Sequence, residues 1–430
     1  MNSQNPHPEA QGLLGLPVEI MGLIMKEIEL LPEPYKQLLQ FAKTCRALAA
    51  QAIPQLYYKD ATESLKLTQD QDMPIALQWA CWYGVLGTAK SSLEALGRTV
   101  TDTDVTQKIS QPFNNDNLYH LRYKTVKRRG PSGPAYCYLH WGSKSGLLHL
   151  ACLRGNTAIA KMLMDKGAHP DTPDGKNLPA LAYALNEDVA QLLIDYGADI
   201  NVTHGTDETA LCHLISWGPM EDVDWNKEFN MPRGDGALTP LHTRHDHLST
   251  IKLLIQNPKT DIYADRIKNV SPLQLAVTRR YVEAVELLLD AGASPNPIHS
   301  EGGKRLLLTD ALKRIENSPI IRMLLDAGAE ADLEHMPEGG LSEEQGSDLP
   351  IMNLTSSGSN PLYAREEVEI ARLVCKKIKH FDANMGEHPA LWHYVRRGRG
   401  DIGQVLIQAG ADPEVANVEV RDTVLGLIAH

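Results

Sequence analysis

The sequence predicts an all-α protein in which a short three-helix module precedes a long solenoid of repeated helix pairs. A phrase ending in Gly-Ala recurs along the chain, each time after a run of apolar residues. A second phrase, of the type Thr-Pro-Leu, opens successive units at intervals of about 30 residues. Isoleucines spaced four apart near the N-terminus predict the separate helical module. The 430 residues are enough for two or three domains.

The N-terminal module covers residues 13–60. Ile20, Ile24 and Ile28 form one apolar stripe on its first helix. Prolines then break the chain, and two further helices follow, the last over residues 47–53. Three helices of this length form a core too small to be stable alone. We therefore expect the module to pack against the rest of the chain or against another protein.

Four features of this module carry a family resemblance: the opening Leu-Pro, the spaced isoleucines, a Thr-Cys-Arg triplet and a closing Pro-x-Leu-Tyr. The segment resembles an F-box. The resemblance implies that it docks on the Skp-family adaptor of a cullin–RING ubiquitin ligase. The residues at the motif positions would make that contact: Leu16, Pro17, Ile20, Ile24, Leu38, Phe41, Cys45 and Leu48.

Residues 61–430 are predicted to form the repeat array. Thr or Ser can cap a helix start, and the Pro that follows suits the first turn. The opening and closing phrases are similar to those of ankyrin repeats, and Thr239–His242 reproduces the family tetrapeptide Thr-Pro-Leu-His. A weak unit is expected before Asp382, in addition to eight that start near Ile75, Gly146, Lys176, Thr209, Thr239, Ser271, Leu307 and Pro389.

Two insertions, at 98–144 and 333–358, interrupt the array. The second is rich in Gly, Glu and Ser and is expected to be a mobile loop. In the first, segments rich in Tyr and β-branched residues flank a Gly-Pro-rich stretch, which predicts a β-hairpin with a long loop. Basic and aromatic residues in this hairpin could bind a partner, and the alternative is a solvated face. The candidates are Tyr119, Tyr123, Arg128 and Arg129.

Composition and charge narrow the function classes. The formal net charge of −12 disfavours general nucleic-acid binding, because an acidic protein repels phosphate backbones. The 6 cysteines include no C-x-x-C pair and indicate a reducing compartment, the cytosol or nucleus. Residues 1–12 are polar and expected to be disordered, with no signal-peptide pattern. No apolar run is long enough to span a membrane.

Two clusters could carry chemistry. His242, His245 and His247 are spaced so that they could bind zinc, but no further ligand set completes a site, and the favoured interpretation is structural. The basic group Arg396, Arg397 and Arg399 is expected to be exposed and structural. The sequence holds no phosphate-binding loop or nucleophile elbow. We therefore expect no catalytic, metal or cofactor site.

The resemblance implies the substrate-recruiting subunit of an SCF-type ubiquitin ligase, with the adaptor on the F-box and an unidentified target on the ankyrin repeats. Ubiquitin transfer would be performed by other subunits, so the chain itself is not expected to be an enzyme. One alternative is an ankyrin scaffold for protein–protein interaction with no ligase role. A more distant alternative is a nucleic-acid-associated regulator that acts through the basic hairpin.

Overall fold

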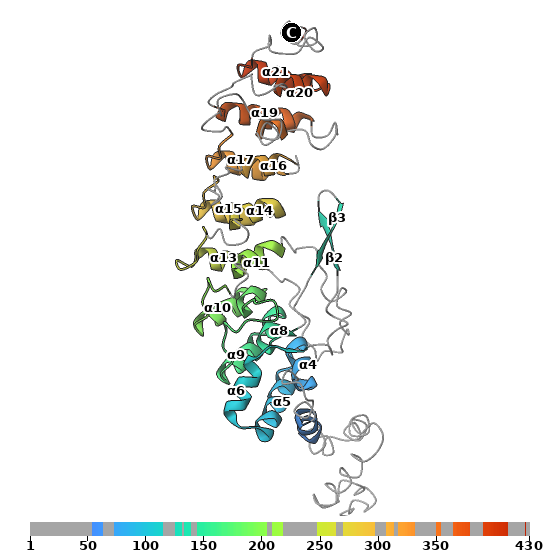
Figure 1. Cartoon of the computed structure of the whole chain (residues 1–430), viewed down its shortest axis with the longest axis vertical. Coiled ribbons are helices and arrows are strands. Elements are labelled where there is room, and N and C mark those ends of the chain that lie inside the picture. Colours follow the sequence, from blue (N-terminus) through green and yellow to red (C-terminus); the bar gives the residue numbers. More distant parts are fainter. Residues whose placement is uncertain are drawn as a thin grey trace, which may run out of the picture.

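The structure is a computed structural model. It describes residues 54–62, 73–114, 125–130, 133–138, 144–203, 209–217, 247–263, 270–296, 307–313, 317–331, 350–353, 364–378, 390–411 and 426. Helix pairs stack into an elongated column that advances from α4 (Ile75–Tyr83) and α5 (Leu86–Thr99) at one end to α20 (Ala390–Arg396) and α21 (Gly400–Gln408) at the other (Figure 1).

Each layer of the column holds one inner and one outer helix, and within the described residues there are eight layers. The remaining inner elements, each in contact with the next, are α8 (Leu147–Leu153), η4 (Ala180–Tyr183), α11 (Ala210–Trp217), α14 (Pro272–Arg279), α16 (Leu307–Leu312) and η6 (Pro350–Asn353). The remaining outer helices are α9 (Thr157–Asp165), α10 (Glu187–Asp195), α13 (His247–Gln256), α15 (Val282–Asp290), α17 (Ser318–Asp326) and α19 (Ala364–Lys377).

Left-handed residues turn the chain from the inner to the outer helix of a layer. Gly155 and Gly398 do so with φ of 67° and 73°, a conformation that glycine adopts without steric cost. Gly84 takes the same role in the first layer, with φ of 74°. In the fifth layer Arg280 occupies this position with φ of 56°, although a side chain makes that conformation unfavourable.

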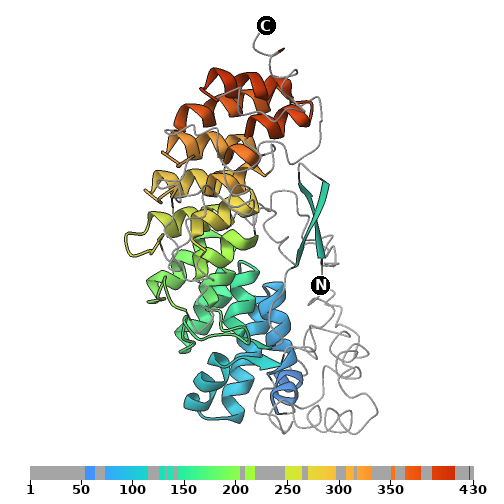
Figure 2. The same ribbon diagram turned by 45° about the horizontal axis from the view of Figure 1, so that its top comes forward.

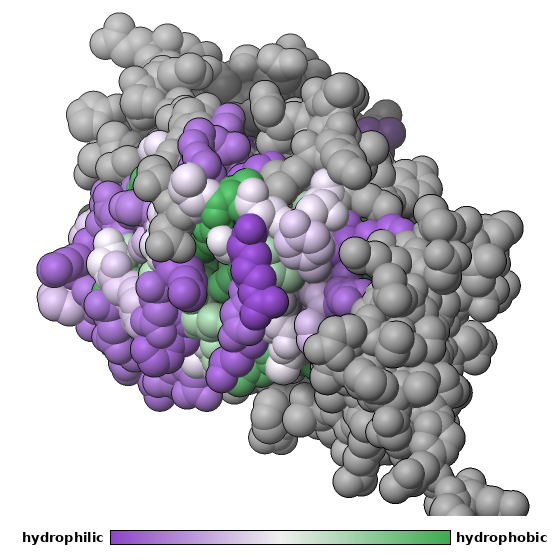
Figure 3. Space-filling view, turned by 90° about the horizontal axis from the view of Figure 1, so that it is seen from below, coloured by the Kyte–Doolittle hydropathy of each residue, from purple (hydrophilic) through white to green (hydrophobic). Residues whose placement is uncertain are grey.

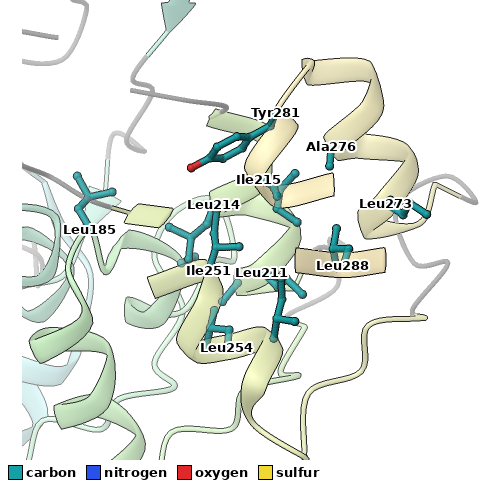
Figure 4. Close-up of a cluster of buried hydrophobic side chains, with 14 of the residues drawn as sticks. Leu185, Leu211, Leu214, Ile215, Ile251, Leu254, Leu273, Ala276, Tyr281 and Leu288 are labelled. Carbon is teal, nitrogen blue, oxygen red and sulfur yellow. The ribbon is translucent and has the colours of Figure 1, made fainter. Parts of the chain in front are cut away.

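The apolar residues of successive layers form one continuous core. Leu288 of α15 and Leu273 of α14 are fully buried, together with Leu211 and Ile251 from the layer before (Figure 4). No single layer could bury its apolar face alone, so the stability of the column comes largely from the contacts between neighbours.

Separate units were expected to open at Thr209 and Thr239, but the described helices that follow these two phrases, α11 (Ala210–Trp217) and α13 (His247–Gln256), belong to one layer. In that layer α11 contacts the inner elements η4 and α14, while α13 contacts the outer helices α10 and α15. The layer therefore takes its inner helix from the first phrase and its outer helix from the second. Thr239–His242 itself lies outside the described residues.

The seventh layer corrects the bounds of the second insertion. The predicted insertion 333–358 contains η6, which serves as an inner element because Ile351 is buried and its carbonyl accepts a hydrogen bond of 2.5 Å from the Tyr394 hydroxyl. With α19 it forms the weak unit expected before Asp382. The rest of that insertion lies outside the described residues.

The first insertion, predicted as 98–144, begins with structure that packs on the column. Thr101 caps α6 (Asp102–Ser110) by accepting a hydrogen bond from the Asp104 amide. Val105 and Ile109 of this helix are buried, and α6 contacts both α5 and α8. The short strands β1 (Phe113–Asn114) and β4 (Lys144–Ser145) then pair and bring the two ends of the insertion together.

The predicted β-hairpin is present, with a shorter turn than expected. Strand β2 (Thr125–Gly130) pairs antiparallel with β3 (Gly133–Tyr138), and only residues 131–132 connect them. The binding candidates Arg128 and Arg129 lie in β2 opposite Ala135 and Pro134. The hairpin stands on the inner-helix side of the column in both views (Figures 1 and 2).

A helical segment at residues 54–62 crosses the predicted boundary between the module and the array. It starts at Pro54, which is compatible with a first helical turn. The Asp60 carboxylate accepts hydrogen bonds from the amides of Ile75 (3.1 Å) and Ala76 (2.9 Å) at the start of α4, and Ala61 is fully buried. This segment is therefore anchored to the first layer. The rest of the predicted module, 13–53, lies outside the described residues.

Candidate functional site

Side-chain amides connect the turns that follow successive outer helices. Asn201 donates a hydrogen bond of 2.6 Å to the Lys259 carbonyl and accepts one of 2.9 Å from the Asp261 amide. Asn296 makes the same two contacts with the layer that follows it. It donates a hydrogen bond of 3.1 Å to the Gly328 carbonyl and accepts one of 2.8 Å from the Glu330 amide. These bridges fix the edge of the column where the Gly-Ala phrases lie.

A second set of contacts connects the layers at the start of the outer helices. Asn156, which precedes α9, donates a hydrogen bond of 2.7 Å to the Cys81 carbonyl in the previous layer. Its amide lies so close to Gly84 that a Cβ atom there would be 2.6 Å from Asn156 Oδ1. Asn186 lies against Gly155 in the same way. Glycine is therefore required at these turns for space as well as for conformation.

A buried polar network occupies the inner side of the second and third layers. His149 Nδ1 accepts a hydrogen bond from the Gly146 amide, so Nε2 carries the proton and donates it to the Leu178 carbonyl at 3.1 Å. Asp174 accepts a hydrogen bond of 2.6 Å from the hydroxyl of Tyr183, whose ring contacts that of His149. These partners all lie within the array and His149 is buried, so the contacts favour a structural role for this histidine.

Comparisons with known proteins agree with this geometry. A model for ankyrin repeats (3 copies) matches residues 136–204, and a single ankyrin repeat model matches residues 268–300. The chain contains ankyrin repeats. Neurogenic locus notch homolog protein 1 of Danio rerio is 34% identical over 164 residues, which are 35% of this chain and 6% of that protein. The chain thus corresponds to a small part of that relative.

A solved structure, the ankyrin repeat domain of Bcl-3, described as a unique member of the IkappaB protein family, is also similar to the chain. It has a TM-score of 0.41 and 21% identity, and the match covers 71% of this chain and 100% of that one.

An apolar surface marks the N-terminal end of the ankyrin array. Of the four large hydrophobic side chains that are exposed in the described residues, three lie there: Tyr58 (47%), Ile75 (56%) and Trp79 (38%). Ile75 and Trp79 are one helical turn apart on α4, so they share a face. Seen from this end, hydrophobic surface lies in the middle and hydrophilic side chains border it (Figure 3).

The predicted adaptor-binding residues, Leu16 to Leu48, all lie outside the described residues, as do Tyr119 and Tyr123 of the insertion. Of the four insertion candidates, the structure places the backbones of Arg128 and Arg129 in β2. It therefore brings two of them to the inner-helix side of the array.

The zinc hypothesis finds no support in the described residues, where no group of His, Cys, Asp or Glu could hold a metal ion. His242 and His245 lie outside these residues. His247 begins α13, is buried, and packs against the ring of Tyr281 with 5.5 Å between ring centroids.

The basic group near the C-terminus was expected to be exposed throughout, and Arg399 corrects that expectation. Its guanidinium pairs with Glu367 of the previous layer and, at 2.9 Å, with Asp401. The hydrogen bonds that Arg399 donates to Asp401 are the largest effect on its pKa and raise it, and the contact with Glu367 raises it further, while burial acts in the opposite direction. Arg396 and Arg397 are exposed, and Arg396 lies 4.8 Å from the centroid of the Trp392 ring.

Four of the cysteines in the described residues are free of disulfide bonds. Cys81, Cys152, Cys212 and Cys375 are all buried and reduced. Burial raises the pKa of the Cys81 and Cys152 thiols, which makes them poor nucleophiles. None of the helices in the described part of the chain combines the length and apolarity needed to cross a membrane.

Proposed function

We propose that the chain is the substrate-recruiting subunit of a cullin–RING ubiquitin ligase, with the N-terminal module on the Skp-family adaptor and the ankyrin array on a target protein. Support for the array half comes from the repeats, because stacked ankyrin layers present a long continuous surface that binds proteins. Support for the adaptor half comes from the F-box motif in residues 13–60. Other subunits carry out the transfer of ubiquitin, and the protein works in the cytosol or nucleus.

The observation that carries the proposal is the joint between the module and the array. Residues 54–62, at the end of the motif, are held against the start of α4, where Asp60 accepts hydrogen bonds from two backbone amides and Ala61 is buried. A group-transfer reaction depends on the position of its reactants. An anchored joint meets this requirement because it limits the movement of a bound target relative to the adaptor.

A scaffold without a ligase role is the second candidate. The ankyrin repeats and the exposed apolar surface of Tyr58, Ile75 and Trp79 favour it, because protein binding by the array needs no adaptor. On this alternative the apolar end would bind a further protein partner.

Affinity purification from cells separates the two candidates. The full chain is compared with the double variant Ile20→Asp and Ile24→Asp, which places charges on the apolar stripe of the module. If the chain is a ligase subunit, the adaptor, the cullin and a set of target proteins should co-purify with the wild type. The variant should lose the adaptor and the cullin and keep the targets. Retention of targets by the wild type with no adaptor or cullin would leave the scaffold as the function.

A further inference from the structure

The charges in the C-terminal half of the array are divided between its two faces. Within the described residues, α14, α16, α20 and the turns after them hold six basic side chains and a single acidic one, Asp310. The outer helices of the same layers, α15, α17, α19 and α21, hold eight acidic and five basic side chains, so their balance of charge is acidic. This basic face is therefore a local feature of a chain whose formal net charge is −12.

Two of these basic residues occupy equivalent positions in different layers. Arg279 and Arg397 each come directly before the left-handed residue that ends the inner helix, in the fifth and the eighth layer. Both are exposed, as is Arg396. Because the inner elements contact one another in order, these arginines line one edge of the column.

Two of the six basic side chains, those of Lys313 and Arg399, form ion pairs within the described residues. Asp310 pairs with Lys313 at 2.8 Å, yet the Lys313 side chain stays 43% exposed. Arg399 is mostly covered, with its side chain 14% exposed, and is paired with Glu367 and Asp401, so it is not part of this surface. Arg280 is half-buried and is also set aside. We define the other four residues, Arg279, Lys313, Arg396 and Arg397, as the basic edge.

We propose that the basic edge binds an extended acidic segment, rich in Asp and Glu, of the target protein. This inference rests on the proposed protein-binding function of the array and names the chemistry of its partner. The guanidinium group of arginine matches a carboxylate through two parallel hydrogen bonds. The fifth and eighth layers are three helix spacings apart, about 27 Å. An extended segment of about eight residues spans that length.

A short acidic peptide fits this edge better than a nucleic acid does. The charges form a narrow row on an otherwise acidic molecule, and the overall field repels a long polyanion more than a short segment. The hairpin adds Lys127, Arg128 and Arg129 on β2, which stands on the same inner-helix side of the column (Figures 1 and 2).

The test measures binding of the full chain to a fluorescein-labelled ten-residue peptide of alternating Glu and Ala, by fluorescence anisotropy at low salt. The variant carries Arg279→Glu, Arg396→Glu and Arg397→Glu. A matched control carries Lys252→Glu, Arg365→Glu and Arg372→Glu at exposed positions of the outer helices α13 and α19, so both change the net charge equally. We expect the first variant to lose affinity at least tenfold and the control to lose less than threefold.

Several results would overturn the inference. One is that the wild type does not bind the peptide, and another is that the two triple variants lose equal affinity for it. The third is that single-stranded DNA of equal charge binds more tightly than the peptide, with the same dependence on the three arginines. Melting curves establish that each variant is folded, and a second variant with Gln at the three positions should show an intermediate loss. Adaptor binding, measured on the same proteins, is expected to be unchanged, so a failure of the ligase proposal is seen separately.

Discussion

At the scale of single residues, neighbouring layers are held together by positions where conformation and space are both restricted. Gly84 illustrates this, because its left-handed turn also leaves room for the Asn156 amide of the next layer. The pattern of the sequence indicates such turns where Gly stands. It does not indicate that Arg280 would take the left-handed conformation in the fifth layer, because only the contacts around a residue can hold a side chain there.

Replacement of Gly84 tests this double restriction. We expect Gly84→Ala to destabilise the array by more than the 1–2 kcal/mol or so that a left-handed alanine costs, because the new methyl group meets Asn156. The matched control is Gly87→Ala in α5, where a Cβ has open space and alanine favours the helix. Urea unfolding should show a lower free energy of unfolding for Gly84→Ala and no decrease for Gly87→Ala. Similar midpoints for both would contradict the inter-layer contact.

Truncation of Leu288 tests the core. This residue of α15 is fully buried between layers (Figure 4), so Leu288→Ala should cost about 2–5 kcal/mol, the usual range for such a cavity. Glu286→Ala, two positions earlier and exposed, is the control and should change stability by less than about 0.5 kcal/mol. A loss of that small size for Leu288→Ala in denaturant melts would show that the layers do not share a continuous core.

At the scale of elements, the ion cluster of Glu367, Arg399 and Asp401 between α19 and α21 is expected to make the stability of the array depend on pH. Burial opposes ionisation of Asp401, but the hydrogen bonds from Arg399 outweigh it and hold the pKa of Asp401 below its usual range. A group whose pKa is lowered by folding stabilises the folded state above its unfolded pKa, about 3.9 for Asp. That contribution is lost as the pH falls through the lower, folded value.

Melting temperatures measured between pH 6 and pH 2.5 test this cluster. The wild type should lose stability below about pH 4, and Asp401→Asn should lose less over the same window because it has no proton to gain there. Asp326→Asn, at an exposed position of α17, is the control and should follow the wild type. Parallel curves for all three proteins would exclude Asp401 as a source of the pH dependence.

The hairpin is the other element with a predicted role, in partner binding. Strands β1 and β4 hold the two ends of the insertion together, so residues 118–141 can be replaced by a short Gly-Ser linker without strain on α6 or α8. We expect the shortened chain to melt as the wild type does, because added loop length contributes little to stability, and to lose one or more co-purifying partners. An unchanged set of partners would show that the hairpin is not a recognition element.

At the scale of the whole molecule, the sequence predicts the array well because each recurring phrase contains residues that favour a helix start or a turn locally. The Gly-Ala phrase and the apolar runs locate most layers, and their glycines have the expected conformation. Sequence reasoning fails where one layer combines distant segments, as α11 and α13 do, because only contacts reveal the pairing. The basic edge was likewise not visible, since Arg279 and Arg397 lie more than a hundred positions apart and meet one edge only through stacking.

The most direct measurement of the central claim is the binding of the purified full chain to a purified Skp-family adaptor, followed by isothermal titration calorimetry. We expect a complex with one adaptor per chain, abolished by Ile20→Asp with Ile24→Asp, because burial of each isoleucine contributes on the order of 1.5–3 kcal/mol. Leu288→Ala should leave this binding intact, since it affects the array alone. No heat of binding from a wild-type chain that is folded would contradict the ligase proposal.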